Sequence, residues 1–498
     1  MSILEEDFFK QANEQYAKLV NSLSAEDAQD WEHGEVEEHI TEFGTELMRR
    51  LFQGYLDLRY AQEEYQKDVW GSDGEARPHR RKKTQRQLET VFGEVVVTRV
   101  GYSTQKPEVS ALYPQDGKLN LAADKYSDGL RRRVAEETSK VSFAETSETI
   151  AKTTGGEIGK RQCEEVSVKV AQDFDTFYAQ RAQSGSESTT DLMVLTTDGK
   201  GIVMHSKDLR EVTAKAAEKS AQSSQTRLSP GQKRQRKRMA TVASVYSVPQ
   251  FERRPEDIIG DQRDPPERPA ISNKRVWADV RQDAKTVISE AFEEAARRDP
   301  EHQREWVVLV DGEKHQLDYI KAESKRVGVE VTIVLDFIHV LEYVWKAAFC
   351  FFESGSKEVD AWVMERGLRI LQGKASDVAA GIRRSATLKN LSSSEREKAD
   401  KCADYLLKYR PYLRYDQYLE HGYPIATGVI EGACRHLVND RMDITGARWR
   451  LDRAEAVLRI RALRSSGDFD EYWQFHKLQE FKRNHADKFQ DPERLLVA

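Results

Sequence analysis

The chain has 498 residues, of which 39% are hydrophobic and 33% are charged, and its formal net charge is −6. This length accommodates about three domains, and the acidic balance excludes a protein that coats DNA with its whole surface. Any nucleic-acid binding would therefore depend on local basic patches, because phosphate contacts need Lys and Arg side chains.

Residues 1–70 are predicted to be helical. Between Phe43 and Leu58, apolar residues recur every three or four positions, which places them on one helix face. Such a stripe either packs into a core or forms a dimer seam.

Residues 85–102 change to the two-residue period of strands, and Phe92-Gly93 separates the two runs. This pattern predicts a β-hairpin. The basic run at its base, residues 77–86, has six Lys or Arg and no acidic residue. We expect it to contact DNA phosphates, although a solvated loop can have the same composition. The residues expected to make the contacts are Arg80, Arg81, Lys82 and Lys83.

Residues 120–180 return to a helical pattern that Gly155-Gly156 interrupts. A helix, a glycine turn and a second helix favour a helix-turn-helix, while a plain helical hairpin would have the same pattern. The second helix, near residues 159–173, would present three polar residues to a DNA groove. These are Lys160, Arg161 and Gln162.

From residue 191 onward, strands alternate with helices. A strand over 191–197 is expected to end at Asp198, a second to begin near Gly201, and a third to cover 239–248. The polar stretch 208–238 between them is expected to be a loop. It ends in a second basic run, whose expected DNA contacts are Lys233, Arg234, Arg236 and Arg238.

Residues 249–275 are predicted to be irregular and 277–298 to form an amphipathic helix. A strand over 305–310 ends at Asp311, and a helix near 315–326 and a strand over 329–335 follow. Three strands, a helix, a strand, a helix and a strand form a ribonuclease-H-like order. In that order the first and fourth strands are neighbours, so we expect Asp198 to meet Asp311.

Residues 345–420 have a helical composition, and Glu431 follows in a helix-like segment. Two strand-end aspartates and a helix glutamate can hold two Mg²⁺ ions about 4 Å apart, the arrangement for phosphoryl transfer on nucleic acid. Each residue also has an ordinary interpretation, since Asp-Gly marks turns and a helix glutamate usually faces water.

Seven arginines lie between Arg441 and Arg464. Arg435 comes one helical turn after Glu431, so it could bind a DNA phosphate or form a salt bridge with that carboxylate. Trp449 could stack on a base or belong to the core. Arg441 and Arg448 complete the expected DNA contacts in this region.

The order of the motifs resembles that of bacterial insertion-sequence DDE transposases of the ISKra-type group, which are related to the Mutator-like set. The resemblance rests on TTDGKG at 196–201, VDGEK at 310–314, LDFIHVLEYVW at 335–345 and IEGACRHLVNDRMDITGARW at 430–449. It implies that Asp198, Asp311 and Glu431 bind two Mg²⁺ or Mn²⁺ ions. Asp336 and His339 match a D-x-x-H element near the active site, although Asp336 could instead cap a helix.

The expected fold class is α+β multidomain. The expected regions are a helical and possibly dimerising region 1–75, a β-hairpin module 76–115, a helix-turn-helix domain 116–182, a ribonuclease-H-like catalytic domain 190–344 and 421–465, an all-α insertion 345–420, and a C-terminal helical tail 466–498.

The resemblance implies a transposase that binds terminal inverted repeats, cuts DNA and joins the 3′-OH ends to target DNA, as a homodimer or larger homo-oligomer. The alternatives are a transposase-derived DNA-binding protein that does not cut, and a ribonuclease-H-like structure-specific nuclease. The N-terminus lacks a signal-peptide pattern and no apolar run is long enough for a membrane span. We therefore expect no membrane partner and a bacterial, nucleoid-associated location in the cytoplasm.

Overall fold

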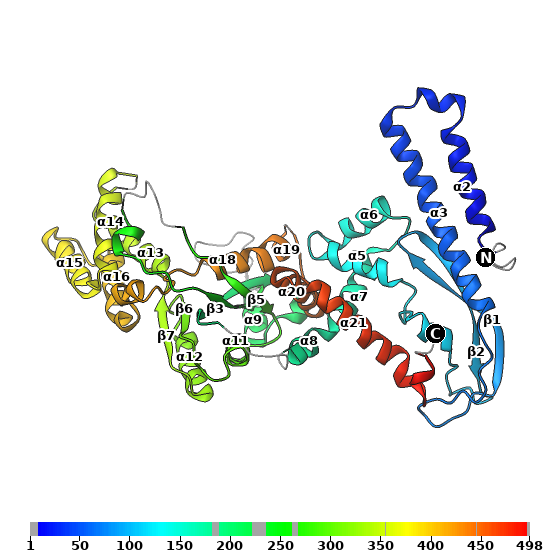
Figure 1. Ribbon diagram of the computed structural model, residues 1–498. Coiled ribbons are helices and arrows are strands. Elements are labelled where there is room, and N and C mark those ends of the chain that lie inside the picture. Colours follow the sequence, from blue (N-terminus) through cyan, green and yellow to red (C-terminus); the bar gives the residue numbers. More distant parts are fainter. Residues whose placement is uncertain are drawn as a thin grey trace. The chain divides into compact units, whose positions relative to one another are not determined.

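The computed structural model describes residues 8–181, 189–221, 236–260, 267–353, 355–444 and 446–495. The chain is an α+β protein with two structural units (Figure 1). The first unit combines Met1–Phe177 with Asp468–Ala498, and the second is Tyr178–Gly467. Among the described residues, a two-stranded sheet lies in the first unit and a five-stranded sheet in the second.

The first unit begins with a pair of helices, α2 (Lys10–Leu23) and α3 (His33–Ala61). A capping box between Glu32 and Glu35 starts α3. The side chain that α3 buries against the hairpin is Leu56, whereas Leu51 and Tyr55 are exposed. Phe43, Leu47 and Leu58 are half-buried, so the expected apolar stripe packs only in part within this chain. Its role as a dimer seam stays a prediction.

The predicted hairpin is confirmed. Strands β1 (His79–Thr90) and β2 (Gly93–Ser103) pair antiparallel, with Thr90 opposite Gly93. Gly93 has a φ of +114°, a conformation that glycine adopts without strain.

The predicted pair of helices around the glycine turn is also present, as α6 (Phe143–Thr153) and α7 (Lys160–Val170). Gly155 is needed between them, because a Cβ there would lie 2.6 Å from the carbonyl oxygen of Phe92. The unit also contains α4 (Pro114–Lys118), α5 (Asp128–Thr138) and η2 (Ala171–Asp173), and α8 (Phe174–Arg181) leads into the second unit.

The C-terminal helices belong to the first unit. Helix α21 (Phe469–Asn484), followed by η7 (Ala486–Lys488) and η8 (Pro492–Leu495), packs with helices between Pro114 and Asp173. Glu480 pairs with Arg131 at 2.9 Å, and Asp173 contacts His476 at 2.7 Å. The predicted C-terminal tail is helical from Phe469, and it packs within the first unit because these buried charges find their partners in the N-terminal part of the chain.

The second unit is built on a mixed sheet in the order β5-β4-β3-β6-β7. Strands β3 (Leu192–Val203), β4 (Lys237–Val248) and β5 (Ser272–Asp279) are antiparallel, while β6 (Trp306–Val310) and β7 (Val331–Leu335) run parallel to β3. The predicted contact between the first and fourth strands is confirmed, because β3 pairs directly with β6.

Helices cover both faces of this sheet (Figure 1). Helices α11 (Ala284–Arg298) and α12 (Lys314–Val327) lie on one side, and α18 (Gly428–Ala433) and α20 (Leu451–Ser466) lie on the other. Double coverage explains why the central strands are continuous apolar runs.

Four expectations about this unit need correction. Residues 277–279 belong to β5, and the helix begins only at Ala284, where the Asp283 side chain accepts from Thr286 N–H at 2.9 Å. β3 continues to Val203 instead of ending before Asp198. The polar stretch after it contains η4 (Ser206–Asp208) and α9 (Glu211–Ala221), and α10 (Pro255–Ile258) interrupts the expected irregular stretch.

The region between β7 and α18 is helical, as its composition predicts. It contains α13 (Phe337–Ala348), α14 (Lys357–Leu371), α15 (Ala375–Leu388), α16 (Glu397–Lys408), η5 (Arg410–Tyr412) and α17 (Tyr415–Glu420). None of the helices in the described residues combines the length and apolar character that crossing a membrane requires.

A buried glutamate links α20 to the edge of the sheet. Glu455 accepts from Val280 N–H at 3.1 Å and pairs with Arg459 at 2.9 Å. Burial, and next the charge of Asp279, raise the pKa of Glu455 to about 7, although Arg459 acts in the opposite direction.

This pKa makes stability depend on pH. Because the folded pKa lies above the unfolded value, the stabilisation is complete below about pH 4.3 and is lost as pH rises through about 7. We expect the melting temperature to fall between pH 5 and 8, and Glu455→Gln to flatten this fall. Thermal melts of both proteins across that range measure it, and parallel curves would contradict the assignment.

Candidate active site

Asp198 and Asp311 stand at the same level of the sheet. The parallel pairing of β3 with β6 ends at Thr196 opposite Leu309, and each aspartate lies two residues beyond that pair. β3 itself continues, since Asp198 still pairs with Val242 of β4. The strand pairing thus brings both aspartates to one edge of the sheet although they are far apart in the sequence.

The Asp198 carboxylate has two hydrogen-bond donors. The N–H of Gly199 donates to Oδ1 at 2.6 Å, and the Cys434 thiol donates to Oδ2 at 3.2 Å. Burial, and next the charge of Asp198, raise the pKa of this thiol, so it stays protonated. Cys434 opens the π-helical turn Cys434–Asn439 after α18, so this contact ties the helix of Glu431 to β3.

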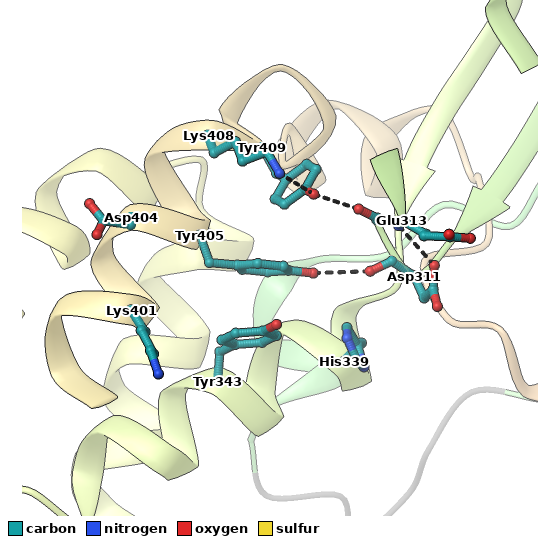
Figure 2. Close-up of a pocket in the computed structure, with 10 residues that line it drawn as sticks. Asp311, Glu313, His339, Tyr343, Lys401, Asp404, Tyr405, Lys408 and Tyr409 are labelled. Atoms are coloured by element: carbon teal, nitrogen blue, oxygen red, sulfur yellow. Dashed lines mark hydrogen bonds between the residues drawn. The ribbon is translucent and has the colours of Figure 1, made fainter. Parts of the chain in front are cut away.

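Asp311 is exposed in the turn after β6, and its Oδ1 accepts from Glu313 N–H at 3.0 Å. It lines a pocket of about 470 Å³ that opens between this turn and the helical region (Figure 2). The pocket is also lined by His339 and Tyr343 of α13 and by Lys401, Tyr405 and Tyr409.

Asp336 connects α13 with the segment that carries Glu431. Its Oδ1 accepts from Ile338 N–H at 2.9 Å, which is the helix-capping contact. Its Oδ2 accepts from the hydroxyl of Thr427, which also lies 3.5 Å from Glu431 Oε1. Asp336 and Thr427 are buried. Asp336 therefore caps α13 and also holds the start of the Glu431 helix.

His339 lies one turn after Asp336. Its ring meets the rings of Tyr343 and Tyr405 edge-on, at centroid distances of 5.6 Å and 6.3 Å. It lines the same pocket as Asp311. The structure thus places this residue beside the acidic site, as the D-x-x-H pattern predicts.

The three carboxylates have the right chemistry for a hard divalent cation, since Mg²⁺ and Mn²⁺ favour carboxylate oxygen. As the side chains stand, however, no group of three or more His, Cys, Asp or Glu in the described part of the chain is arranged to hold a metal ion. Strand pairing brings Asp198 and Asp311 to one sheet edge, as expected, and their binding of a metal ion stays a prediction. Carboxylates repel one another when no cation lies between them, and Asp198 is oriented by its two donors. The matching positions of Asp198 and Asp311 on neighbouring strands suit such a site.

Among the basic residues expected to contact DNA, residues 80–83 are all exposed on β1. The arginines at the two ends of the same basic run instead bind partners within the chain. Arg77 pairs with Asp73 at 2.6 Å, and Arg86 donates to the carbonyl of Ala122 at 3.0 Å. The exposed basic patch is therefore shorter than the run in the sequence.

The second expected group lies at the start of α7. Lys160 and Arg161 are exposed there and Gln162 is half-buried. Arg161 Nε lies 3.1 Å from Glu165 Oε1. Since this ion pair is largely exposed, it leaves the arginine able to exchange partners.

The remaining basic residues lie in the second unit. Arg236 and Arg448 are exposed, whereas Lys233 and Arg234 lie outside the described residues. Arg435 is exposed in the π-helical turn, and the ion pair that it makes is with Asp440 at 3.8 Å rather than with Glu431.

Three assignments to DNA contact are corrected. Arg238 donates to three backbone carbonyl oxygens, one of which is that of Val280 at 2.6 Å. Arg441 is 2% exposed and lies over the ring of Trp449. Trp449 is 5% exposed and donates from Nε1 to the carbonyl of Met442 at 2.9 Å. These side chains hold the fold together, and the core interpretation of Trp449 is the one that applies.

Some site residues were not anticipated from the sequence. Thr427 and Cys434 lie four residues before and three after Glu431, so helical spacing could have revealed that they share its face. Tyr405 and Tyr409, which contact the Asp311 turn, belong to a run of tyrosines at spacings of three and four. The regular spacing of these tyrosines was the sequence signal that could have revealed them.

Comparison with protein-family models and with curated proteins gave no match for this chain. The resemblance to transposases therefore stays a prediction from the motifs.

The bridge at Thr427 can be tested by stability. Thr427→Val keeps the shape but leaves the buried Asp336 carboxylate without one of its donors, so we expect a loss of about 1–3 kcal/mol in the free energy of unfolding. Urea denaturation measures it. The control is Thr387→Val, an exposed threonine that should change the value by less than about 0.5 kcal/mol. Equal effects of the two changes would contradict a structural role for the bridge.

Proposed function

We propose that this chain is a DDE-class DNA transposase that uses Asp198, Asp311 and Glu431 with Mg²⁺ or Mn²⁺. The proposal rests above all on the two aspartates at the same level of neighbouring parallel strands. It is supported by the helix of Glu431, which packs against β3 and is tied to Asp198 through Cys434. Carboxylates gathered at one sheet edge are what two-cation phosphoryl transfer on DNA requires.

The strand order supports a ribonuclease-H-like catalytic domain over 190–344 and 421–465. Three antiparallel strands come first in the chain, and two parallel strands follow beside the first of them. Residues 345–420 would then be an all-α insertion before the last acid. In the first unit, the helix pair α6 and α7 is proposed as a helix-turn-helix within 116–182, beside the hairpin module 76–115.

In the proposed reaction Asp198, Asp311 and Glu431 would hold the divalent ions beside the scissile phosphate. When bound, such ions lower the pKa of a water molecule and stabilise the oxygen that leaves phosphorus. The 3′-OH released by cutting would then attack a phosphorus atom of the target DNA at the same site. The new P–O bond replaces the target's own P–O3′ bond, and the departing 3′-oxygen takes up a proton. Arg435, exposed one turn beyond Glu431, is available to bind an adjacent phosphate.

The proposed partners are terminal inverted repeats and target DNA. Residues 80–83 would bind phosphates, and the start of α7 would distinguish the end sequence. Since two ends must be joined together, a homodimer or larger homo-oligomer is proposed, acting at the nucleoid in bacterial cytoplasm.

The acidic residues are tested by single isosteric changes. Asp198→Asn, Asp311→Asn and Glu431→Gln each remove a cation ligand, whose loss costs several kcal/mol in the transition state, so cleavage should fall about a hundredfold or more. The assay uses labelled duplexes from the DNA flanking the gene, a target plasmid, and Mg²⁺ or Mn²⁺.

Asp318→Asn, an exposed aspartate on α12, is the matched control and should cleave as wild type does. Wild-type cleavage by any of the three test variants removes that residue from the site. Cutting without joining would favour a structure-specific nuclease, and binding without cutting would favour a DNA-binding derivative.

The basic patch is tested by the salt dependence of DNA binding. Arg81→Gln with Lys82→Gln removes two exposed charges, so the slope of log K against log salt should become shallower by about 0.9 for each lost contact, for any DNA sequence. Fluorescence anisotropy at several salt concentrations measures the slope.

The control removes the same charge elsewhere, by Lys285→Gln with Lys325→Gln on exposed positions of α11 and α12. It should leave the slope unchanged. An equal change of the slope in both double variants would mean that the slope depends on the net charge of the protein and that β1 makes no phosphate contact.

A further inference from the structure

A run of tyrosines connects the helical region to the sheet. Five tyrosines between Tyr405 and Tyr418 follow one another at spacings of three or four, and four of them are buried. Each buried one donates its hydroxyl to a backbone carbonyl oxygen after or within β6 and β7. A buried hydroxyl needs such a partner, and here the partners all belong to the ends of two strands.

Two of these tyrosines cover the open edge of the sheet. Asp336 N–H donates to Val310 O of β6. Because successive residues of a strand point their backbone groups in opposite directions, the carbonyls of Leu335 and Ile333 face away from β6. β7 is the last strand of the sheet. Tyr415 donates to Leu335 O at 2.7 Å and Tyr418 to Ile333 O at 3.3 Å. These hydroxyls satisfy carbonyls that an edge strand would otherwise expose.

The other two hold the turn that carries Asp311. Tyr405 donates to Asp311 O at 3.2 Å, and Tyr409 donates to Gly312 O (Figure 2). Gly312 has a φ of +95°, and a Cβ there would lie 3.4 Å from the Tyr405 hydroxyl. The two carbonyls lie beyond the end of β6, so strand pairing does not orient them.

The ring of Tyr405 is itself fixed. Tyr343 of α13 stacks on it with a centroid distance of 3.9 Å and an angle of 10°, and His339 meets it edge-on (Figure 2). Burial raises the pKa of Tyr405, so its hydroxyl keeps the proton that it donates.

The Asp311 carboxylate depends on this support. It is exposed, and its hydrogen bond from Glu313 N–H comes from the same turn. The direction of the carboxylate therefore follows the conformation of the turn, whose carbonyls the tyrosines hold. A ligand must be placed within about 0.5 Å to bind a metal well.

We propose that Tyr405 and Tyr409 are positioning residues that orient Asp311 for divalent-metal binding. The helical region 345–420 is then part of the acidic site, because it supplies both hydroxyls. This inference rests on the proposed function, since it takes Asp311 as a metal ligand.

The test compares two pairs of identical changes in the full chain. Tyr405→Phe and Tyr409→Phe remove the hydroxyls at the Asp311 turn, while Tyr415→Phe and Tyr418→Phe remove the hydroxyls at the edge of β7. Melting temperature is recorded against Mn²⁺ concentration, because a ligand that binds the folded state raises it. All four changes should lower the melting temperature without metal. Only the first pair should raise the half-saturating Mn²⁺ concentration, by about tenfold.

The result that overturns the inference is the same half-saturating Mn²⁺ concentration in both pairs. Failure of the proposed function has a different signature. In that case the wild type shows no Mn²⁺ response, or its response survives in Asp311→Asn. A wild-type response that is lost in Asp311→Asn, with no difference between the tyrosine pairs, removes the positioning role alone.

Discussion

The candidate site depends on the parallel pairing of β3 with β6. This pairing ends at Thr196 opposite Leu309, and it brings to one sheet edge two aspartates that are separated in the chain by β4, β5 and several helices. A shift of one residue in this register would turn one carboxylate to the other face. The register is held by the buried apolar residues of both strands, which helices cover on both sides.

The third acidic residue reaches the same edge through polar contacts rather than strand pairing. Thr427 joins the start of its helix to Asp336, and Cys434 joins the following turn to Asp198. Glu431 lies between these two anchors and is itself exposed. The helix is thus fixed at both ends, and the Asp311 carboxylate is oriented separately, by the turn after β6. Buried neutral donors suit this task, because they hold the backbone without neutralising the acidic residues.

Much of the secondary structure in both units followed from the sequence alone, since short apolar runs, an amphipathic helix and the order of elements are local properties. The hairpin, the α6–α7 pair and the neighbouring positions of the first and fourth strands were predicted in this way and are present. The prediction failed where residues outside a segment determine its secondary structure or the partners of its side chains. Trp277 was assigned to a helix, but β4 draws it into β5 as a strand. The basic charges of Arg238 and Arg441 suggested DNA, yet both side chains are used inside the fold.

By itself the sequence determined which residues could do chemistry: two aspartates after apolar runs, a helix glutamate, and exposed basic residues on a hairpin. Only the tertiary structure decided how they are supported. It places Cys434, Thr427, Tyr405 and Tyr409 in hydrogen-bond contact with Asp198, with Asp336 and with the turn after β6. It also packs the C-terminal helix in the first unit. The physical reason is that a residue's type limits the bonds that it can make, whereas its partner depends on what long-range packing places beside it.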